Sequence, residues 1–183
     1  TQPLPIGGVS IVVITVAALT GTLKISEAIS GFANSAIWLI VGAFLFSRGF
    51  IKTGLGKRIA YNLISAFGSS SLRLAYALAL SDLILAPATP SNTARVGGVI
   101  MPITTSLAKA FGSEPQDGPR KIGSFLMQSI YQVNTITSAM FQTSMAGNTL
   151  VAALAIQSFG IGITWGDWAM AAIVPGIVAL LIM

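Results

Sequence analysis

Residues 86–95 read Ala86-Pro87-Ala88-Thr89-Pro90-Ser91-Asn92-Thr93-Ala94-Arg95, a polar stretch with two prolines that is set inside apolar sequence. Apolar runs precede it at 72–85 and follow it at 96–111. The prolines lack a backbone N–H and disfavour helix in the residue before them. We therefore expect two helical arms of about 15 residues, each roughly 22 Å long. They should be joined by an irregular tip that carries Ser91, Asn92 and Thr93.

Arms of this length are shorter than the hydrocarbon core of a bilayer, which is about 30 Å thick. We interpret residues 72–111 as a re-entrant hairpin whose tip ends inside the membrane. Unwound backbone at that depth is tolerated only where it is buried in protein or lines a wet cavity. The sequence therefore predicts a binding site at the polar tip.

The composition is that of a membrane protein in contact with a lipid bilayer. Of the 183 residues, 54% are hydrophobic and 8% are charged, whereas soluble domains carry about 25% charge. The net charge of +5 does not predict a nucleic-acid partner, because the basic residues flank apolar runs. The sequence has no Cys and no His, which excludes thiolate metal sites and an imidazole relay within it, so we do not expect an enzyme. The Thr1 start and the apolar end predict a fragment.

Four further apolar segments complete an all-α, polytopic architecture. We expect spans at 9–23 and 35–46, a broken transmembrane helix over 122–163, and a truncated span at 168–183. We expect residues 141–149 to interrupt that helix, with Gly147 and Asn148 at the break, where unwound backbone again predicts a site. The alternative for Gly147 is a packing notch between helices.

The segment at 51–67 has apolar residues at a four-residue spacing: Ile51, Leu55, Ile59, Leu63 and Phe67. Basic and polar residues occupy the other positions. This pattern predicts an amphipathic helix that lies in the membrane interface, and the alternative is an ordinary connector.

The positions of the charged residues support the hairpin. A re-entrant path leaves Lys24, Glu27 and Asp167 on one side, and the positive-inside rule makes the other, basic side cytoplasmic. A single crossing at 72–111 would scatter the charges over both faces. The loop at 114–120 is accordingly predicted on the same side as the basic residues before it. The basic side holds Arg48, Lys52, Lys57, Arg58, Arg73, Lys109, Arg120 and Lys121.

The tip residues Ser91, Asn92 and Thr93 supply hydroxyl and amide groups. The helix that begins after them directs the positive end of its dipole at the tip, where a carboxylate is favoured. Oxygen ligands at such a break also suit a hard cation such as Na⁺. The alternative is that Ser91 or Asn92 caps the second arm, and the two roles are compatible.

Asp82 and Arg95 are ionisable residues on opposite arms, close enough to the tip to pair. Charges at membrane depth are functional hypotheses by default. We interpret Asp82 as a structural partner. We interpret Arg95 as a functional residue, because a guanidinium beside a polar tip binds a carboxylate or stands where a cation would.

The string Pro-Ala-Thr-Pro-Ser-Asn-Thr-Ala-Arg at 87–95, with Thr-Ser-Ala-Met-Phe-Gln-Thr at 137–143 and Gly147-Asn148, resembles the divalent anion/Na⁺ symporter family. It is most similar to the 2-oxoglutarate/malate and citrate/succinate translocator branch, over essentially the whole chain. The resemblance implies the first of two inverted repeats, with a dimeric scaffold domain (here 1–70) and a moving transport domain (here 71–183).

The resemblance also implies that Asn92 and Thr93 contact a substrate carboxylate. The expected substrate-binding residues are Ser91, Asn92, Thr93, Arg95 and Asn148. In a Na⁺-coupled protein, Ser91, Asn92 and Gly147 would surround the first cation.

Two residues near the tip favour exchange over Na⁺ coupling. Pro87, one turn before Ser91, offers no hydroxyl ligand, and Arg95 adds a fixed positive charge. We predict a secondary transporter that exchanges small dicarboxylates such as 2-oxoglutarate, malate or succinate. It would be a homodimer in a bacterial inner membrane or a plastid inner envelope, with no cofactor. The alternatives are a Na⁺-coupled dicarboxylate symporter and a channel or structural membrane protein.

Overall fold

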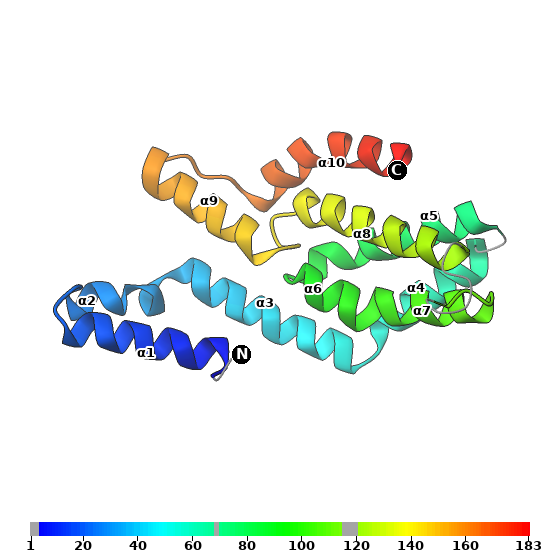
Figure 1. Cartoon of the computed structure of the whole chain (residues 1–183). Helices are drawn as coiled ribbons and strands as arrows, with labels where there is room; N and C mark the ends of the chain where they lie inside the picture. The colour runs from blue at the N-terminus through cyan, green and yellow to red at the C-terminus, as the bar shows by residue number, and fades with distance from the viewer. Residues whose placement is uncertain (1–3, 68–69, 115–120) are drawn as a thin grey trace. The chain divides into compact units, whose positions relative to one another are not determined.

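The computed structural model describes residues 4–67, 70–114 and 121–183, and the regular structure in these ranges is helical throughout (Figure 1). The chain divides into two compact units, Thr1–Leu39 and Ile40–Met183. The all-α prediction is confirmed for the described residues. The predicted division at residue 70 into scaffold and transport parts stays a prediction.

The first unit contains α1 (Ile6–Leu19), α2 (Ile25–Ala28), η1 (Ser30–Ala33) and the beginning of α3 (Ser35–Lys52). Helix α1 corresponds to the span expected at 9–23, but it ends earlier, before a turn in which Gly21 has a φ of 70°. None of its residues is buried. A helix that is apolar and exposed all round is typical of a surface that lipid or further protein covers.

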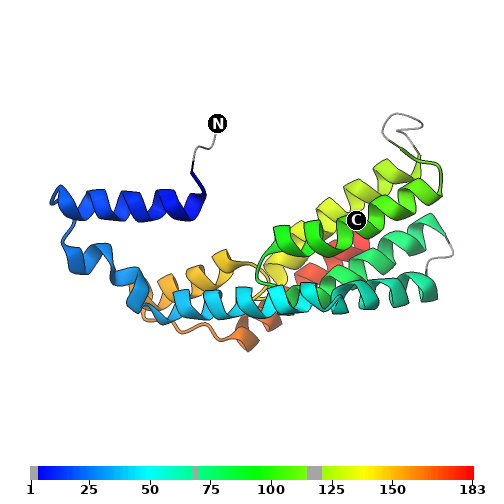
Figure 2. The same cartoon turned by 90° about the horizontal axis from the view of Figure 1, so that it is seen from below.

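The second unit contains the rest of α3 and the segments that follow it. Figures 1 and 2 show α4, α5, α7 and α8 running side by side, and α8 packs against both α5 and α7. Its elements after α3 are α4 (Leu55–Phe67), α5 (Ser71–Leu85), η2 (Ala86–Ala88), α6 (Asn92–Arg95), η3 (Val96–Ile100), α7 (Met101–Ala110), α8 (Ile122–Met140), α9 (Ala146–Phe159) and α10 (Trp165–Ile182).

The expected hairpin is present as two helical arms and an irregular tip. The first arm is α5, which Ser70 caps by accepting a hydrogen bond from the Arg73 N–H at 3.3 Å. The second arm runs through α6, the π-helical turn η3 and α7. Such π-helical turns are frequent at functional sites. Whether the hairpin re-enters the membrane, and whether it belongs to the first of two inverted repeats, stay predictions.

Among the described residues, two segments are long and apolar enough to cross a membrane by length and composition, Ser71–Ala88 and Trp165–Ile182. Half of the first lies buried inside the protein, against 11% of the second. The first arm together with η2 therefore reaches a spanning length, so arm length alone does not decide between a re-entrant and a crossing path. Shorter apolar helices occur at Ile6–Leu19, Ile37–Gly49 and Ala146–Phe159.

The main hydrophobic core lies between α4, the two hairpin arms and α8. Leu78 of α5, Ile103 of α7 and Leu126 of α8 are at most 1% exposed. Burial of a Leu or Ile side chain contributes about 1.5–3 kcal/mol, so this core holds the hairpin as one body with α8. A smaller cluster of Ala79, Val133, Met140 and Leu180 joins α10 to α8.

Helix α4 buries one face against α5, and its place in the membrane interface stays a prediction. Gly56 and Ala60 are buried, and Ile59 packs against the core with α5. In contrast Leu55 and Phe67, from the expected apolar line, are 46% and 52% exposed. Small residues let α5 approach closely, so tertiary packing rather than the four-residue pattern selects the buried face.

The break in the second long helical region lies within the interruption predicted at 141–149, and it is shorter than that interruption. Helix α8 ends at Met140 and α9 begins at Ala146, so Gly147 and Asn148 belong to the first turn of α9. The predicted hydrophilic loop at 112–120, and with it the expected side of 114–120, lies largely outside the described residues. Residues 68–69 also lie outside the described part; they belong to the stretch 68–71, where the sequence predicts a break before the hairpin.

Candidate functional site

The tip of the hairpin places its polar residues at the start of the second arm. Ser91 is the N-cap of α6, and its hydroxyl accepts a hydrogen bond from the Ala94 N–H at 3.2 Å. Asn92 accepts one from the Thr93 N–H through Oδ1 at 2.9 Å. Thr93 is exposed, and Ser91 and Asn92 are half-buried. The capping role of Ser91 is therefore present, and the Asn92 amide N–H₂ donates no hydrogen bond within the described residues.

The tip and the helix break are tied together by two direct contacts. The Ala146 N–H donates to the carbonyl of Pro90 at 3.0 Å. The Thr143 hydroxyl donates to the carbonyl of Pro87 at 2.7 Å. Buried carbonyls of an unwound tip must be paired. Residues of the break supply hydrogen-bond donors to two such carbonyls, those of Pro87 and Pro90. The two irregular segments therefore lie in direct contact.

Arg95 lies beneath the tip and is completely buried, with 0% of its surface exposed. Its Nε donates to Asp82 Oδ1 at 2.8 Å, so the predicted pairing of these two residues is confirmed. One terminal nitrogen donates to the carbonyls of Thr89 and Ser144, both at 3.2 Å. The other contacts three side chains of α8, each at 3.2 Å: Asn134, Thr137 and Ser138.

We call Arg95, Asp82 and these five partners the sealed network. Asp82 is 1% exposed and also accepts a hydrogen bond from the Thr137 hydroxyl. A buried ion pair is tolerated only when hydrogen bonds satisfy its remaining donors and acceptors, and removal of one partner costs about 3–5 kcal/mol. The sealed network therefore connects both hairpin arms to α8 and to the break.

Asn148 is 6% exposed and holds the end of α8. Its amide N–H₂ donates to the carbonyls of Ser138 at 2.7 Å and Phe141 at 2.9 Å. These are among the carbonyls that a helix end leaves without intrahelical partners. Gly147 beside it is half-buried, and a Cβ at this position would meet the Met145 methyl at 3.3 Å.

Sequence reasoning missed most of the partners of Arg95. Three of them, Asn134, Thr137 and Ser138, follow a spacing of three and four residues on one face of α8. That spacing was a usable signal, because polar residues on one face of an apolar helix need a polar neighbour. The carbonyls of Thr89 and Ser144 carry no sequence signal.

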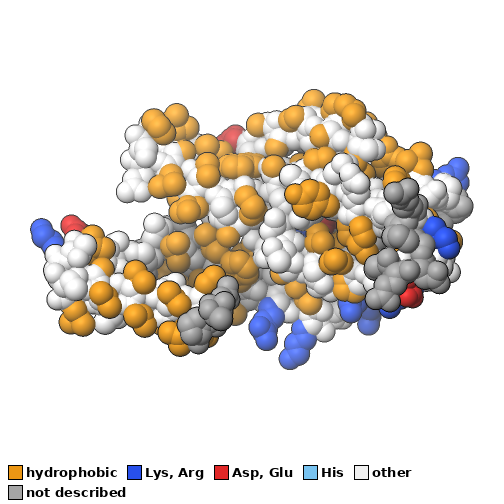
Figure 3. Space-filling view, viewed as in Figure 1, with side chains coloured by type: hydrophobic (Ala, Val, Ile, Leu, Met, Phe, Trp, Pro, Cys, Tyr) orange, Lys and Arg blue, Asp and Glu red, His pale blue; other side chains and the backbone are white. Residues whose placement is uncertain are grey.

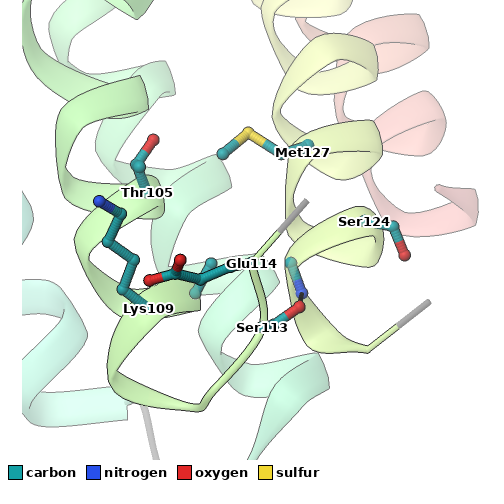
Figure 4. A pocket seen from close by; sticks show the side chains of 8 residues that line it. Thr105, Lys109, Ser113, Glu114, Ser124 and Met127 are labelled. Atoms are coloured by element: carbon teal, nitrogen blue, oxygen red, sulfur yellow. Dashed lines mark hydrogen bonds between the residues drawn. The ribbon is translucent and has the colours of Figure 1, made fainter. Parts of the chain in front are cut away.

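One cavity of about 280 Å³ lies at the far end of the second arm, between α7 and α8 (Figure 4). Thr105, Lys109, Glu114 and Met127 line it. Thr105 is twelve residues beyond Thr93, which along a helix is roughly 18 Å. Glu114 in its lining is the last described residue before 121, so we assign no site to this cavity.

Residues 1–183 match the family model of the sodium:sulfate symporter transmembrane region. A putative malate transporter, YflS of Bacillus subtilis, is 57% identical over the whole chain, which spans 38% of that protein. Dicarboxylate transporter 1, chloroplastic, of Spinacia oleracea is 50% identical, again over the whole chain and over 32% of the relative. An L-tartrate/succinate antiporter of Escherichia coli is 47% identical over 79% of the chain and 30% of its own length. The chain thus spans about a third of the curated relatives that it matches.

Proposed function

Because the chain belongs to the sodium:sulfate symporter transmembrane family, we propose that it is the first of two inverted repeats of a secondary transporter that exchanges small dicarboxylates. The family is one of membrane transporters rather than enzymes, which agrees with the sequence-based expectation. The similar proteins named for malate, dicarboxylates, and L-tartrate and succinate support this substrate class. The membrane would be a bacterial inner membrane or a plastid inner envelope. The protein would dimerise through the part at 1–70.

The observation that carries the proposal is the union of the hairpin tip with the helix break. The Ala146 N–H to Pro90 contact holds two irregular segments together beside the Asn92 amide and the Thr93 hydroxyl. Substrate sites of secondary transporters are typically built from such discontinuous helices. We propose that Asn92 and Thr93 donate hydrogen bonds to one carboxylate of the substrate, and that Ser91 orients them as the helix cap.

Arg95 and Asn148 are proposed members of the site whose donors are already used. A direct contact of Arg95 with the substrate requires the guanidinium to give up a hydrogen bond to Thr89 or Ser144. Likewise, Asn148 would bind through its oxygen or would have to release a carbonyl of α8. The contacts support a role for both residues in holding the site together.

The charge of Arg95 was the sequence-based argument for exchange, because a fixed cation cannot leave with the substrate. Its pairing with Asp82 makes the two residues neutral together, which weakens that argument. Exchange is therefore proposed on the names of the relatives, one of which is an antiporter. The second candidate is Na⁺-coupled symport, which the family description favours. In that case Ser91, Asn92 and Gly147 would supply the cation site.

Purified full-length protein in liposomes tests the proposal. We expect uptake of labelled succinate into liposomes preloaded with unlabelled succinate, and none into empty liposomes, with or without a Na⁺ gradient. Uptake into empty liposomes that depends on inward Na⁺ would replace exchange by symport. Absence of dicarboxylate uptake under both conditions would contradict the proposed function.

A further inference from the structure

A cavity of about 620 Å³ lies between α3 and the hairpin tip. The second half of α3 forms most of its wall, and Ala94 of α6 closes it on the hairpin side. Ala94 directly follows Thr93 and donates its N–H to Ser91. The cavity therefore opens beside the tip residues that the proposed function assigns to the substrate.

The charge on this cavity is positive and uncompensated. Arg48 and Lys52 line it, and their four-residue spacing on α3 puts them on one face of the helix. The cavity lining contains no acidic residue. Neither Arg48 nor Lys52 forms an ion pair with a described residue; the ion pair found among those residues joins Arg95 to Asp82. In Figure 3, Lys and Arg side chains gather along the lower edge of the second unit.

Most of the remaining wall is apolar and comes from Phe44, Leu45 and Ile51. The polar Ser47 also lines the cavity and is only 2% exposed. A cleft lined by charge of one sign with low-dielectric walls focuses the field and concentrates the opposite ion. The volume falls within the range of small-molecule sites, about 300–1,000 Å³. A dicarboxylate of four or five carbons is small enough to enter a space of this volume.

We propose that this cavity is an anion vestibule, in which Arg48 and Lys52 hold a dicarboxylate on its way to Asn92 and Thr93. The proposal rests on the proposed function, because it needs a dicarboxylate as substrate. Its residues belong to α3 rather than to the hairpin, so they act on capture rather than on the bound state at the tip. The vestibule should therefore lower the KM for the substrate and leave kcat nearly unchanged.

The test uses full-length protein in phosphatidylcholine liposomes preloaded with unlabelled succinate. Four proteins are compared: the wild type, the variant Arg48→Lys, the double variant Arg48→Gln/Lys52→Gln, and the double variant Lys57→Gln/Arg58→Gln. The last is the matched control, because it removes the same charge from exposed positions on α4 that do not line the cavity. Initial rates of labelled succinate uptake at increasing concentration give KM and kcat at low and high ionic strength.

At about 0.01 M salt, where the Debye length is roughly 30 Å, we expect Arg48→Gln/Lys52→Gln to raise KM about three- to tenfold. At about 1 M salt the Debye length is roughly 3 Å, and the difference from the wild type should vanish. The control should keep the wild-type KM, and Arg48→Lys should also keep it. Because Arg48 and Lys52 are exposed, we expect the double variant to elute like the wild type in size-exclusion chromatography.

An unchanged KM of the Arg48→Gln/Lys52→Gln variant at low salt, or an equal rise in the control, overturns the vestibule while wild-type exchange upholds the proposed function. A wild type without dicarboxylate uptake removes both proposals together. Anionic lipid headgroups share the chemistry that this cavity recognises, so the same comparison is repeated with phosphatidylglycerol in the liposomes. An effect confined to those liposomes would assign the cavity to lipid and overturn the vestibule.

Discussion

The hairpin carries two polar layers that differ in burial, although Arg95 of one follows Asn92 of the other by only three positions along the chain. The upper layer contains exposed Thr93 and half-buried Asn92. The lower layer is the sealed network, in which Arg95 is 0% and Asp82 is 1% exposed. The neutral donors are thus reachable, and the charged group is enclosed.

This difference in burial distinguishes residues suited to bind the substrate from residues suited to stabilise the structure. A donor that is to receive a substrate must be free or weakly bonded, because a hydrogen bond already made inside the protein has to be broken first. The Thr93 hydroxyl makes only a 3.5 Å hydrogen bond to Asn92 Oδ1. A buried charge that is to fix structure must be saturated, because an unpaired one is costly. We propose that the upper layer binds the carboxylate and that the sealed network positions it.

The largest effect is expected from Asp82→Asn, which leaves the Arg95 charge buried without its counter-ion. The free energy of unfolding should fall by about 3–5 kcal/mol. The measurement is the thermal transition of full-length protein in detergent, together with the fraction that elutes as a single species. Asp167→Asn is the control, because Asp167 is an exposed capping residue of α10, bonded within its own turn to Thr164.

The control should keep a transition close to that of the wild type. If Asp82→Asn melts like the wild type, the ion pair does not hold the hairpin and the comparison between the two layers fails.

A smaller effect is expected from Asn92→Ala, and it should appear in binding instead of stability. A hydrogen bond to a charged group contributes about 1.5–3 kcal/mol, so the affinity for succinate should fall roughly 10- to 150-fold. Equilibrium binding of labelled succinate and the thermal transition are measured on the same preparation. Asn62→Ala, on the exposed side of α4, should change neither. Wild-type affinity in a folded Asn92→Ala protein would reduce the tip to a helix cap.

The sequence was sufficient to predict the hairpin and its tip, because proline acts locally. Pro87 and Pro90 remove backbone donors wherever they stand, so the interruption between α5 and α6 follows from the chain itself. The pairing of Asp82 with Arg95 was also predictable, because opposite charges in apolar surroundings are stabilised by pairing with each other. The contacts of Arg95 to the carbonyls of Thr89 and Ser144 were not, because they depend on where the helix break folds back.

The extent of that break was predictable only in part. The sequence predicts an interruption at 141–149, and α8 does end at Met140, but α9 already begins at Ala146 and includes Gly147 and Asn148. The interruption is fixed by hydrogen bonds to the end of α8. The Ser144 hydroxyl donates to the carbonyl of Ser138 at 2.6 Å, and the Asn148 amide donates to the same carbonyl. The face that α4 presents to α5 could not be predicted from the sequence, because it depends on packing at the small buried residues Gly56 and Ala60.

Cysteine accessibility tests the central claim most directly. In a full-length protein without other cysteines, Thr93→Cys samples the upper layer, and Thr89→Cys samples the sealed network, where Thr89 is 2% exposed. The rate of reaction with a membrane-impermeant maleimide is measured with and without saturating succinate. The account predicts that Thr93→Cys reacts and that succinate slows the reaction, while Thr89→Cys stays unreactive in both conditions. Equal reactivity at the two positions, or a Thr93→Cys rate that succinate leaves unchanged, would contradict it.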